Sequence, residues 1–181
     1  MVLYGHSLGG AAALHLVDQL GRQGHAGGTA TAGEGDATGR GGVCGMIVEN
    51  PMPSVPTMVR ALYSHKWLPY HYLGPLAFDR WDSVAAMRAP GKRAPRPPSL
   101  WLRSGADEII EEAGVREMYG EYRRGRAESE EGDAQVDREA AGVEAAADRW
   151  VECPGALHDT AYLDRRWRGE IRAFVSRVAE G

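Results

Sequence analysis

The sequence has few of the residues that build disulfide frameworks or zinc sites. Its 181 residues contain two cysteines, Cys44 and Cys153, with no CxxC pair and no Cys/His spacing typical of zinc. We interpret both as free thiols in a reducing compartment and expect both to lie in the core, as free cysteines usually do. The sequence indicates no metal and no organic cofactor.

Long apolar runs and an excess of positive charge are also absent. The longest apolar stretch, residues 11–17, is interrupted by His15 and is far shorter than the roughly 20 residues of a membrane-spanning helix. The 21 basic residues are scattered and outnumbered by 25 acidic ones, for a formal net charge of −4, which argues against a nucleic-acid partner. An apolar content of 43% and a charged content of 25% exclude collagen-like, coiled-coil and fully disordered chains and predict a globular protein of one domain.

Segments of biased composition interrupt the apolar pattern. Residues 21–42 hold many of the 24 glycines and almost no apolar side chains, so we expect a mobile surface insert. Residues 120–149 are dominated by Glu, Arg, Gly and Ala, and we expect a solvated excursion, although residues 134–148 are compatible with a polar helix. The proline-rich residues 89–98 predict an extended connector.

Between these segments, short strand-like runs alternate with helical patterns. Runs of apolar, β-branched or aromatic residues bounded by turn residues predict strands at residues 2–4, 43–49, 100–104 and 150–153. The pattern predicts helices at AAALHLVDQL, at Val115, Met118, Tyr119 and Tyr122, and at Trp167, Ile171, Phe174 and Val178. This alternation predicts an α/β fold with a parallel sheet that helices cover on both faces.

A GxSxG pentapeptide, Gly5-His6-Ser7-Leu8-Gly9, lies between the first strand and the first helix. In that context the serine occupies a sharp, strained strand-to-helix turn that exposes its Oγ, which makes Ser7 a candidate nucleophile. We expect glycine at positions 5 and 9 because larger side chains there would collide with the neighbouring strand and helix. The N–H of Leu8, at the positive end of the helix dipole, is a candidate oxyanion donor.

A serine nucleophile needs a histidine base held by a carboxylate, and in this kind of fold the chain order is Ser, acid, His. Asp107 follows the third predicted strand and His158 follows the fourth, so both lie where open parallel sheets build their sites. Asp107 is also a typical helix-capping residue, and Glu108, above all, and Asp159 are alternatives for the acid. His158 is the preferred base, because the other histidines lie in the glycine-rich insert, on the first helix, beside the serine or in the middle segment.

These residues resemble the α/β-hydrolase-fold serine hydrolases, and more narrowly the bud-emergence (Bem-type) subgroup, which is related to protein depalmitoylases. GHSLGG alone is shared by lipases, esterases and peptidases, whereas the later motifs together are similar to the subgroup. The resemblance covers most of the chain outside the two biased inserts and is carried by GHSLGGAAA at 5–13, IVENP at 47–51, WDS at 81–83, PSLWLRSGADEII at 98–110 and LHDTAY at 157–162. It implies Ser7 as nucleophile, Asp107 as acid and His158 as base, with no cofactor.

The sequence departs from the family pattern in two places. The turn between Gly105 and Asp107 is one residue shorter than is usual in the family, so the choice between Asp107 and Glu108 stays open. The family also has about half a domain before the nucleophile strand, including the loop that gives a second oxyanion-hole amide. The resemblance therefore implies that residues 1–181 are the C-terminal part of the fold, from the nucleophile elbow to the last helix, and that any membrane anchor would lie in a segment before the hydrolase domain.

Residues 53–89 occupy the position where this fold carries a lid, and they either line an acyl pocket or cover the sheet. The large apolar side chains of this lid-like segment are Met58, Leu62, Tyr63, Trp67, Leu68, Tyr70, Tyr72, Leu76, Phe78 and Trp81. The expected function is hydrolysis of ester or thioester bonds in small-molecule, lipid-like or acylated-protein substrates. The alternatives are an inactive, truncated remnant or binding module of the same fold, and a serine aminopeptidase-like enzyme.

Overall fold

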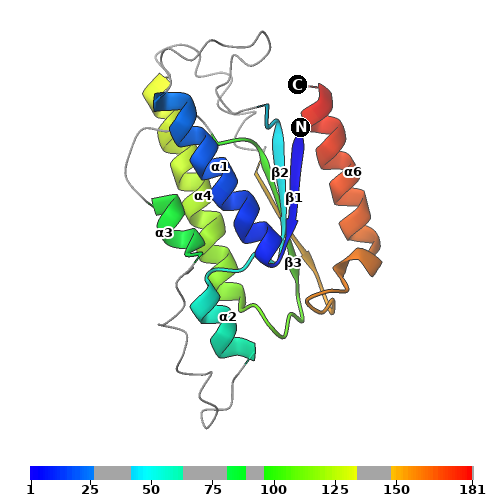
Figure 1. The fold of residues 1–181 in the computed structure, drawn as a ribbon. Helices are drawn as coiled ribbons and strands as arrows, with labels where there is room; N and C mark the ends of the chain where they lie inside the picture. Colours follow the sequence, from blue (N-terminus) through cyan, green and yellow to red (C-terminus); the bar gives the residue numbers. More distant parts are fainter. Residues whose placement is uncertain (27–41, 63–80, 89–95, 134–147, 181) are drawn as a thin grey trace.

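The computed structural model of the chain describes residues 1–26, 42–62, 81–88, 96–133 and 148–180 (Figure 1). Strands and helices alternate along these residues, as the sequence predicts. The strands are β1 (Val2–His6), β2 (Gly45–Glu49), β3 (Ser99–Ser104) and β4 (Arg149–Cys153). The helices are α1 (Leu8–Ala26), α2 (Val55–Leu62), α3 (Ser83–Arg88), α4 (Glu112–Asp133), the short 3-10 helix η4 (Ala161–Leu163) and α6 (Arg165–Glu180).

The four strands form one parallel sheet in the order β1-β2-β3-β4. The register pairs His6 with Glu49 and Ser104 with Cys153, so the carboxyl ends of neighbouring strands lie at one edge of the sheet. Ser7 and Asn50 directly follow β1 and β2. The sheet therefore brings together, at one edge, the loops that carry the predicted site.

Helices cover both faces of the sheet, which confirms the predicted α/β fold (Figure 1). The side chains of β2 alternate between the faces because successive residues of a strand point in opposite directions. Met46 and Val48 pack in the core beneath α1, α3 and α4, whereas Ile47 packs with Phe174 of α6 on the other face. Within the described ranges, no helix is long and apolar enough to cross a membrane.

The expected insert at residues 21–42 begins later than predicted, because α1 continues to Ala26. Gly21 is buried, and Arg22 forms an ion pair with Asp18 one turn earlier at 2.8 Å, so packing and a side-chain pair extend the helix through a sequence of low helix propensity. Residues 27–41 lie outside the described part of the chain.

The expected solvated excursion at residues 120–149 is wrong for its first half. Residues 120–133 form the larger, C-terminal part of α4, with Tyr122 and Arg126 buried. Arg126 pairs at 3.2 Å with Asp148, and Tyr122 OH donates to the carbonyl of Pro97 at 2.7 Å. These contacts with distant segments hold the helix against the sheet. Residues 134–147, which include most of the compatible polar helix, lie outside the described part of the chain.

The expectations for the two cysteines and for the proline-rich connector are confirmed only in part. Cys153 is buried in the core as predicted, but Cys44, one residue before β2, is exposed. Residues 96–98 have no regular secondary structure. The rest of the proline-rich connector, 89–95, lies outside the described residues.

Candidate active site

Ser7 has a left-handed backbone conformation, with φ 53°, which is uncommon for a residue other than glycine and marks strain at functional turns. The surrounding backbone holds it there. Its N–H donates to the carbonyl of Glu49 at 2.9 Å, and its carbonyl accepts from the N–H groups of Gly10, Ala11 and Met52 at 3.0, 3.2 and 3.1 Å. The sharp turn predicted for GxSxG is therefore present and ties β1, α1 and the segment after β2 together.

The steric requirement for glycine in this turn is confirmed at position 5 but not at position 9. A Cβ at Gly5 would lie 2.3 Å from the carbonyl oxygen of Gly9, as expected of a forced glycine. A Cβ at Gly9 would meet nothing within 4 Å, so the expected collision at that position is wrong. The close approach occurs one residue later, because Gly10 faces Pro51, whose Cβ would lie 2.9 Å from a Cβ built there.

Leu8 is the first residue of α1, and its side chain is about half exposed. The first amides of a helix have no acceptor within the helix and lie at the positive end of its dipole. The N–H of Leu8 therefore has the position expected of an oxyanion donor, and its role in that capacity stays a prediction.

The side chains of Asp107 and His158 form a buried pair. Asp107 Oδ2 lies 2.9 Å from His158 Nδ1, and the Asp107 side chain is fully buried. Its other oxygen, Oδ1, accepts the N–H groups of Ile109 and Ile110 at 2.9 and 2.8 Å, and the guanidinium of Arg103 lies 3.9 Å from Oδ2. Because an ionised carboxylate only accepts hydrogen bonds, Nδ1 carries the hydrogen, and the Nε2 lone pair of the neutral ring is left to accept a proton.

The other two candidate acids lie differently. Glu108 Oε2 accepts the backbone N–H of His158 at 3.1 Å and so contacts the base through its peptide. Asp159 is exposed. Asp107 also accepts hydrogen bonds from backbone N–H groups of its own turn. It therefore makes the contacts of a capping residue as well as the contact with the imidazole. These N–H groups precede α4, which begins at Glu112.

The pair shifts both pKa values in the direction that favours the charged forms. The hydrogen bond with Asp107 raises the pKa of His158 above its ordinary value, against the effect of burial, and the charges of Asp107, Glu108 and Asp159 add to it. Burial alone would raise the pKa of Asp107. The hydrogen bonds from His158 and from the N–H groups of Ile110 and Ile109 outweigh that effect and hold the pKa of Asp107 below its ordinary value.

The carbonyl of His158 binds two side chains that sequence reasoning did not assign to the site. Asn50 Nδ2 lies 2.9 Å from it and His6 Nε2 lies 2.8 Å from it. The centroid of the His6 ring also lies 4.8 Å from that of the His158 ring. Asn50 could have been predicted from its position in the sequence. It is a polar residue directly after a buried strand, and such residues lie at the edge of the sheet that holds the site.

Ser7 adjoins His6 in the chain, so Ser7 and His158 lie at the same edge of the sheet. Among the contacts of the described residues, no hydrogen bond joins Ser7 Oγ to the His158 ring. Nucleophile–base hydrogen bonds are often long without substrate and tighten in the complex. The structure thus brings the three predicted residues to one edge and pairs two of them directly.

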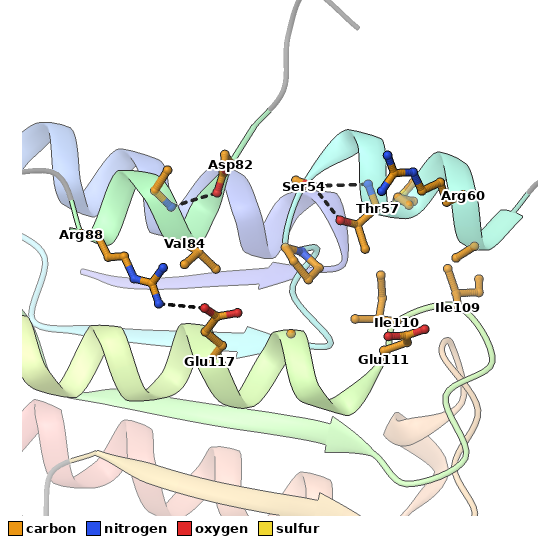
Figure 2. A pocket seen from close by; sticks show the side chains of 15 residues that line it. Ser54, Thr57, Arg60, Asp82, Val84, Arg88, Ile109, Ile110, Glu111 and Glu117 are labelled. Carbon is orange, nitrogen blue, oxygen red and sulfur yellow. Dashed lines mark hydrogen bonds and ion pairs between the residues drawn. The ribbon is translucent and has the colours of Figure 1, made fainter. Parts of the chain in front are cut away.

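A cavity of about 980 Å³ lies beside this edge, between α2, α3 and the start of α4 (Figure 2). Two of its polar side chains have partners: Arg88 pairs with Glu117 at 2.8 Å, and Asp82 Oδ1 accepts the backbone N–H of Ala85 at 2.9 Å. Ser7 and His158 do not line it. The expected lid stays a prediction, because residues 63–80, with Tyr63, Trp67, Leu68, Tyr70, Tyr72, Leu76 and Phe78, lie outside the described residues.

No group of three or more His, Cys, Asp or Glu side chains in the described part of the chain is arranged to hold a metal ion. The edge of the sheet holds a serine with a left-handed backbone, an imidazole whose Nδ1 is bound, and a buried carboxylate.

In comparisons of the sequence, no family model and no curated protein matches this chain. Among solved structures, the chain is similar to an esterase of Pyrococcus furiosus, with 12% sequence identity and a TM-score of 0.52 over 97% of this chain and 52% of the esterase. It is also similar to a truncated form of a carbohydrate esterase from gut microbiota, with 12% identity and a TM-score of 0.55 over 98% of this chain and 59% of that one.

The chain thus spans a little more than half the length of these two structures. The parallel sheet and its helices correspond to part of the α/β-hydrolase fold. At this level of identity the likeness concerns the fold, and the narrower resemblance to the Bem-type subgroup stays a prediction.

Proposed function

We propose that this chain carries the catalytic residues of a serine hydrolase that cleaves ester or thioester bonds, with Ser7 as nucleophile, His158 as base and Asp107 as the acid that orients it. The observation that carries the proposal is the 2.9 Å contact between the buried Asp107 carboxylate and His158 Nδ1, at the edge of the sheet where the strained Ser7 turn lies. The likeness in fold to esterases supports the reaction class.

In the proposed reaction, Ser7 Oγ attacks the acyl carbonyl carbon and His158 Nε2 takes the hydroxyl proton. The N–H of Leu8 donates to the oxyanion of the tetrahedral intermediate. The intermediate collapses, the alcohol or thiol leaves with the proton from His158, and the acyl group stays on Ser7. Water, deprotonated by the same imidazole, then attacks the acyl-enzyme; the bond between the acyl carbon and Ser7 Oγ breaks, the carboxylic acid leaves, and His158 returns the proton to Ser7 Oγ.

The electrostatics of the Asp107–His158 pair suit this cycle. His158 is protonated in both transition states, and the ionised Asp107 stabilises that imidazolium. The lowered pKa of Asp107 keeps the carboxylate ionised at neutral pH, and the raised pKa of His158 reflects the same attraction. The pair therefore stabilises the protonated form of His158, the imidazolium, which is present while negative charge develops on the substrate oxygen.

Labelling with a fluorophosphonate probe tests the proposal, because only an activated serine displaces its fluoride. The wild-type chain, Ser7→Ala and Ser176→Ala are compared after far-UV circular dichroism has shown that each is folded. Ser176 is an exposed serine of α6 and serves as the matched control. We expect labelling of the wild type and of Ser176→Ala and none of Ser7→Ala. A folded wild-type chain that is not labelled would contradict the proposal and favour an inactive binding module.

The class of acyl bond is tested with three substrates of matched acyl length: a p-nitrophenyl ester, an acyl thioester and an aminoacyl anilide. We expect turnover of the ester and the thioester that is lost in Ser7→Ala. Turnover of the anilide alone, with dependence on its free amine, would instead identify a peptidase.

A further inference from the structure

The loop that carries His158 is attached to the rest of the fold through the peptide of His158 itself. Its N–H donates to Glu108 Oε2 at 3.1 Å, and its carbonyl lies 2.9 Å from Asn50 Nδ2 and 2.8 Å from His6 Nε2. With Nδ1 bound to Asp107, every polar atom of His158 except Nε2 has a partner among the described residues. Nε2 is the atom that the proposed reaction uses.

We propose that Asn50, assisted by His6, is a positioning residue that fixes the His158 peptide and thereby the direction of the imidazole. This inference rests on the proposed function for its catalytic consequence, but the structural claim can be tested without activity. Asn50 does not contact the reacting atoms and acts through the carbonyl of His158.

Asn50 is itself held firmly by the sheet and can therefore fix the position of the His158 carbonyl. It directly follows β2, is fully buried and has φ 41°. Its backbone N–H donates to the carbonyl of Leu102 at 3.0 Å, its Oδ1 accepts the N–H of Ser104 at 2.8 Å, and its Nδ2 donates to Ser104 Oγ at 2.8 Å. The remaining Nδ2 hydrogen goes to His158. One side chain thus links the ends of β2 and β3 to the loop after β4.

The partners also fix which way the Asn50 amide is oriented. The Ser104 N–H can only donate and therefore requires the amide oxygen, and the His158 carbonyl can only accept and therefore requires the amide nitrogen. The same argument requires a hydrogen on His6 Nε2. Aspartate has the shape of asparagine but no donor, so Asn50→Asp would keep the acceptor for Ser104 and place an oxygen against the carbonyl of His158.

The second donor, His6, contacts the same loop in two ways, because its ring lies beside that of His158 with the two planes tilted by 48°. His6→Phe would keep an aromatic ring of similar breadth at this place and remove the hydrogen bond. The His6→Phe variant therefore distinguishes the effect of the hydrogen bond to the His158 carbonyl from the effect of packing against the His158 ring. Its effect should have the same direction as that of Asn50→Asp and be smaller, since Asn50 would still hold the carbonyl.

The test follows His158 by NMR and by the kinetics of fluorophosphonate labelling. In the wild type we expect a downfield Nδ1–H signal from His158. Asn50→Asp should weaken or shift that signal and lower the first-order labelling rate constant at saturating probe by about ten-fold or more, because small errors in the placement of a catalytic group are costly. The probe concentration at half-saturation should change little. The matched control is Ser99→Ala, which removes a hydrogen bond of another fully buried side chain, from Ser99 Oγ to Asp148 Oδ1 at 2.7 Å, at the amino end of β3 and so at the opposite end of the sheet from the site.

An Asn50→Asp chain that keeps both the His158 signal and the wild-type rate would overturn the positioning role and leave the proposed function standing. Equal losses in Ser99→Ala would overturn it as well, since general destabilisation would then be the cause. If the folded wild type is not labelled, the proposed function fails and the NMR signal alone decides the positioning role. If Asn50→Asp does not fold, His6→Phe decides, and an unchanged His158 signal and rate in that variant would count against the inference.

Selective 15N-asparagine labelling gives a further readout on the wild-type chain, because Asn50 is the only asparagine in the sequence. Its side-chain amide should give a single pair of proton signals, both slow to exchange with solvent, since both hydrogens are bonded and the group is buried. Fast exchange of either proton would contradict the hydrogen bonds on which the inference depends.

Discussion

Asp107 binds the imidazole of His158 at Nδ1, at 2.9 Å, whereas the next residue, Glu108, binds the backbone N–H of His158 at 3.1 Å. Adjacent carboxylates thus hold the ring and the peptide of the same residue. We expect Asp107→Asn to lower the labelling rate by about three orders of magnitude or more, because the imidazolium loses its charged partner and the tautomer is no longer fixed. Glu108→Gln keeps an acceptor for the His158 N–H and should cost less than about ten-fold. A larger loss in Glu108→Gln than in Asp107→Asn would reverse the assignment of the acid.

The pH dependence of labelling should report the base. His158 accepts a proton only when it is neutral, so the rate should rise with pH through its pKa, which the hydrogen bond and charge of Asp107 raise above the ordinary value of 6.5. The midpoint of the wild-type profile should therefore lie above 6.5, and it should fall in Asp107→Asn. A profile that is flat from pH 5 to 9, or a midpoint that does not move in Asp107→Asn, would show that His158 is not the base.

The same pair makes stability depend on pH, with opposite signs for its two members. The folded pKa of His158 is raised, so its contribution is fully present below the unfolded pKa of about 6.5 and is lost as pH rises through the folded value. The folded pKa of Asp107 is lowered, so its contribution is present above an unfolded pKa of about 3.9 and is lost as pH falls through the folded value. The free-energy difference between wild type and Asp107→Asn, from urea unfolding, should therefore be largest between about pH 4 and 6.5 and smaller on either side.

The glycines of the GxSxG turn offer a matched pair of substitutions. A Cβ at Gly5 would lie 2.3 Å from the backbone oxygen of Gly9, so Gly5→Ala should lower the free energy of unfolding by about 2 kcal/mol or more, because a backbone atom cannot move aside cheaply. Gly9 lies in α1 with open space around it, and Gly9→Ala should raise the free energy of unfolding by about 0.5–1 kcal/mol. Urea unfolding of both variants checks the contrast. Equal destabilisation by the two would mean that the turn is not as tight as the structure has it.

Arg96 joins the segment before β3 to α3 and α4 from a buried position. Its guanidinium donates to the carbonyls of Glu121, Tyr122 and Met87, each at 2.8 Å. Arg96→Ala leaves these carbonyls without that donor and should lower the free energy of unfolding by about 2 kcal/mol or more. Arg96→Lys should recover little, because a single ammonium group does not reproduce the planar fork of donors. The control is Arg172→Ala on the exposed face of α6, and a cost for Arg96→Ala no larger than the control's would contradict the buried role.

The sequence predicted the sheet and the elements that carry the site for identifiable reasons. The strands β2 and β3 are buried along their whole length, and each has three consecutive apolar residues at its centre, at 46–48 and 100–102, which is the signal that predicted them. Parallel strands place their carboxyl ends at one edge, so the order Ser7, Asp107, His158 after successive strands was enough to predict that these residues lie near one another.

The contacts that complete the site could not be predicted from the sequence, because they join residues far apart in the chain. Asn50 and His158 are 108 positions apart, and His6 and His158 are 152 apart. Composition failed for a related reason in α4, where a polar, glycine-containing sequence is helical because Arg126 pairs with Asp148 and Tyr122 packs in the core. Periodicity and composition describe a segment by itself, whereas these features depend on what the segment meets in the fold.

On the face of the sheet that α6 covers, Phe174 is the residue on which stability should depend most. It is 2% exposed and packs with Ile47, Leu102 and Val151, and its ring leaves so little room at β2 that a Cβ at Gly45 would lie 3.1 Å from it. Phe174→Ala removes the ring from a packed cluster and should lower the free energy of unfolding by about 3–5 kcal/mol. Val175→Ala alters an exposed neighbour and should change it by less than about 0.5 kcal/mol. If urea unfolding shows equal costs for the two variants, the packing of α6 on the sheet is not what stabilises this face, and the cluster around Phe174 would have to be reassigned.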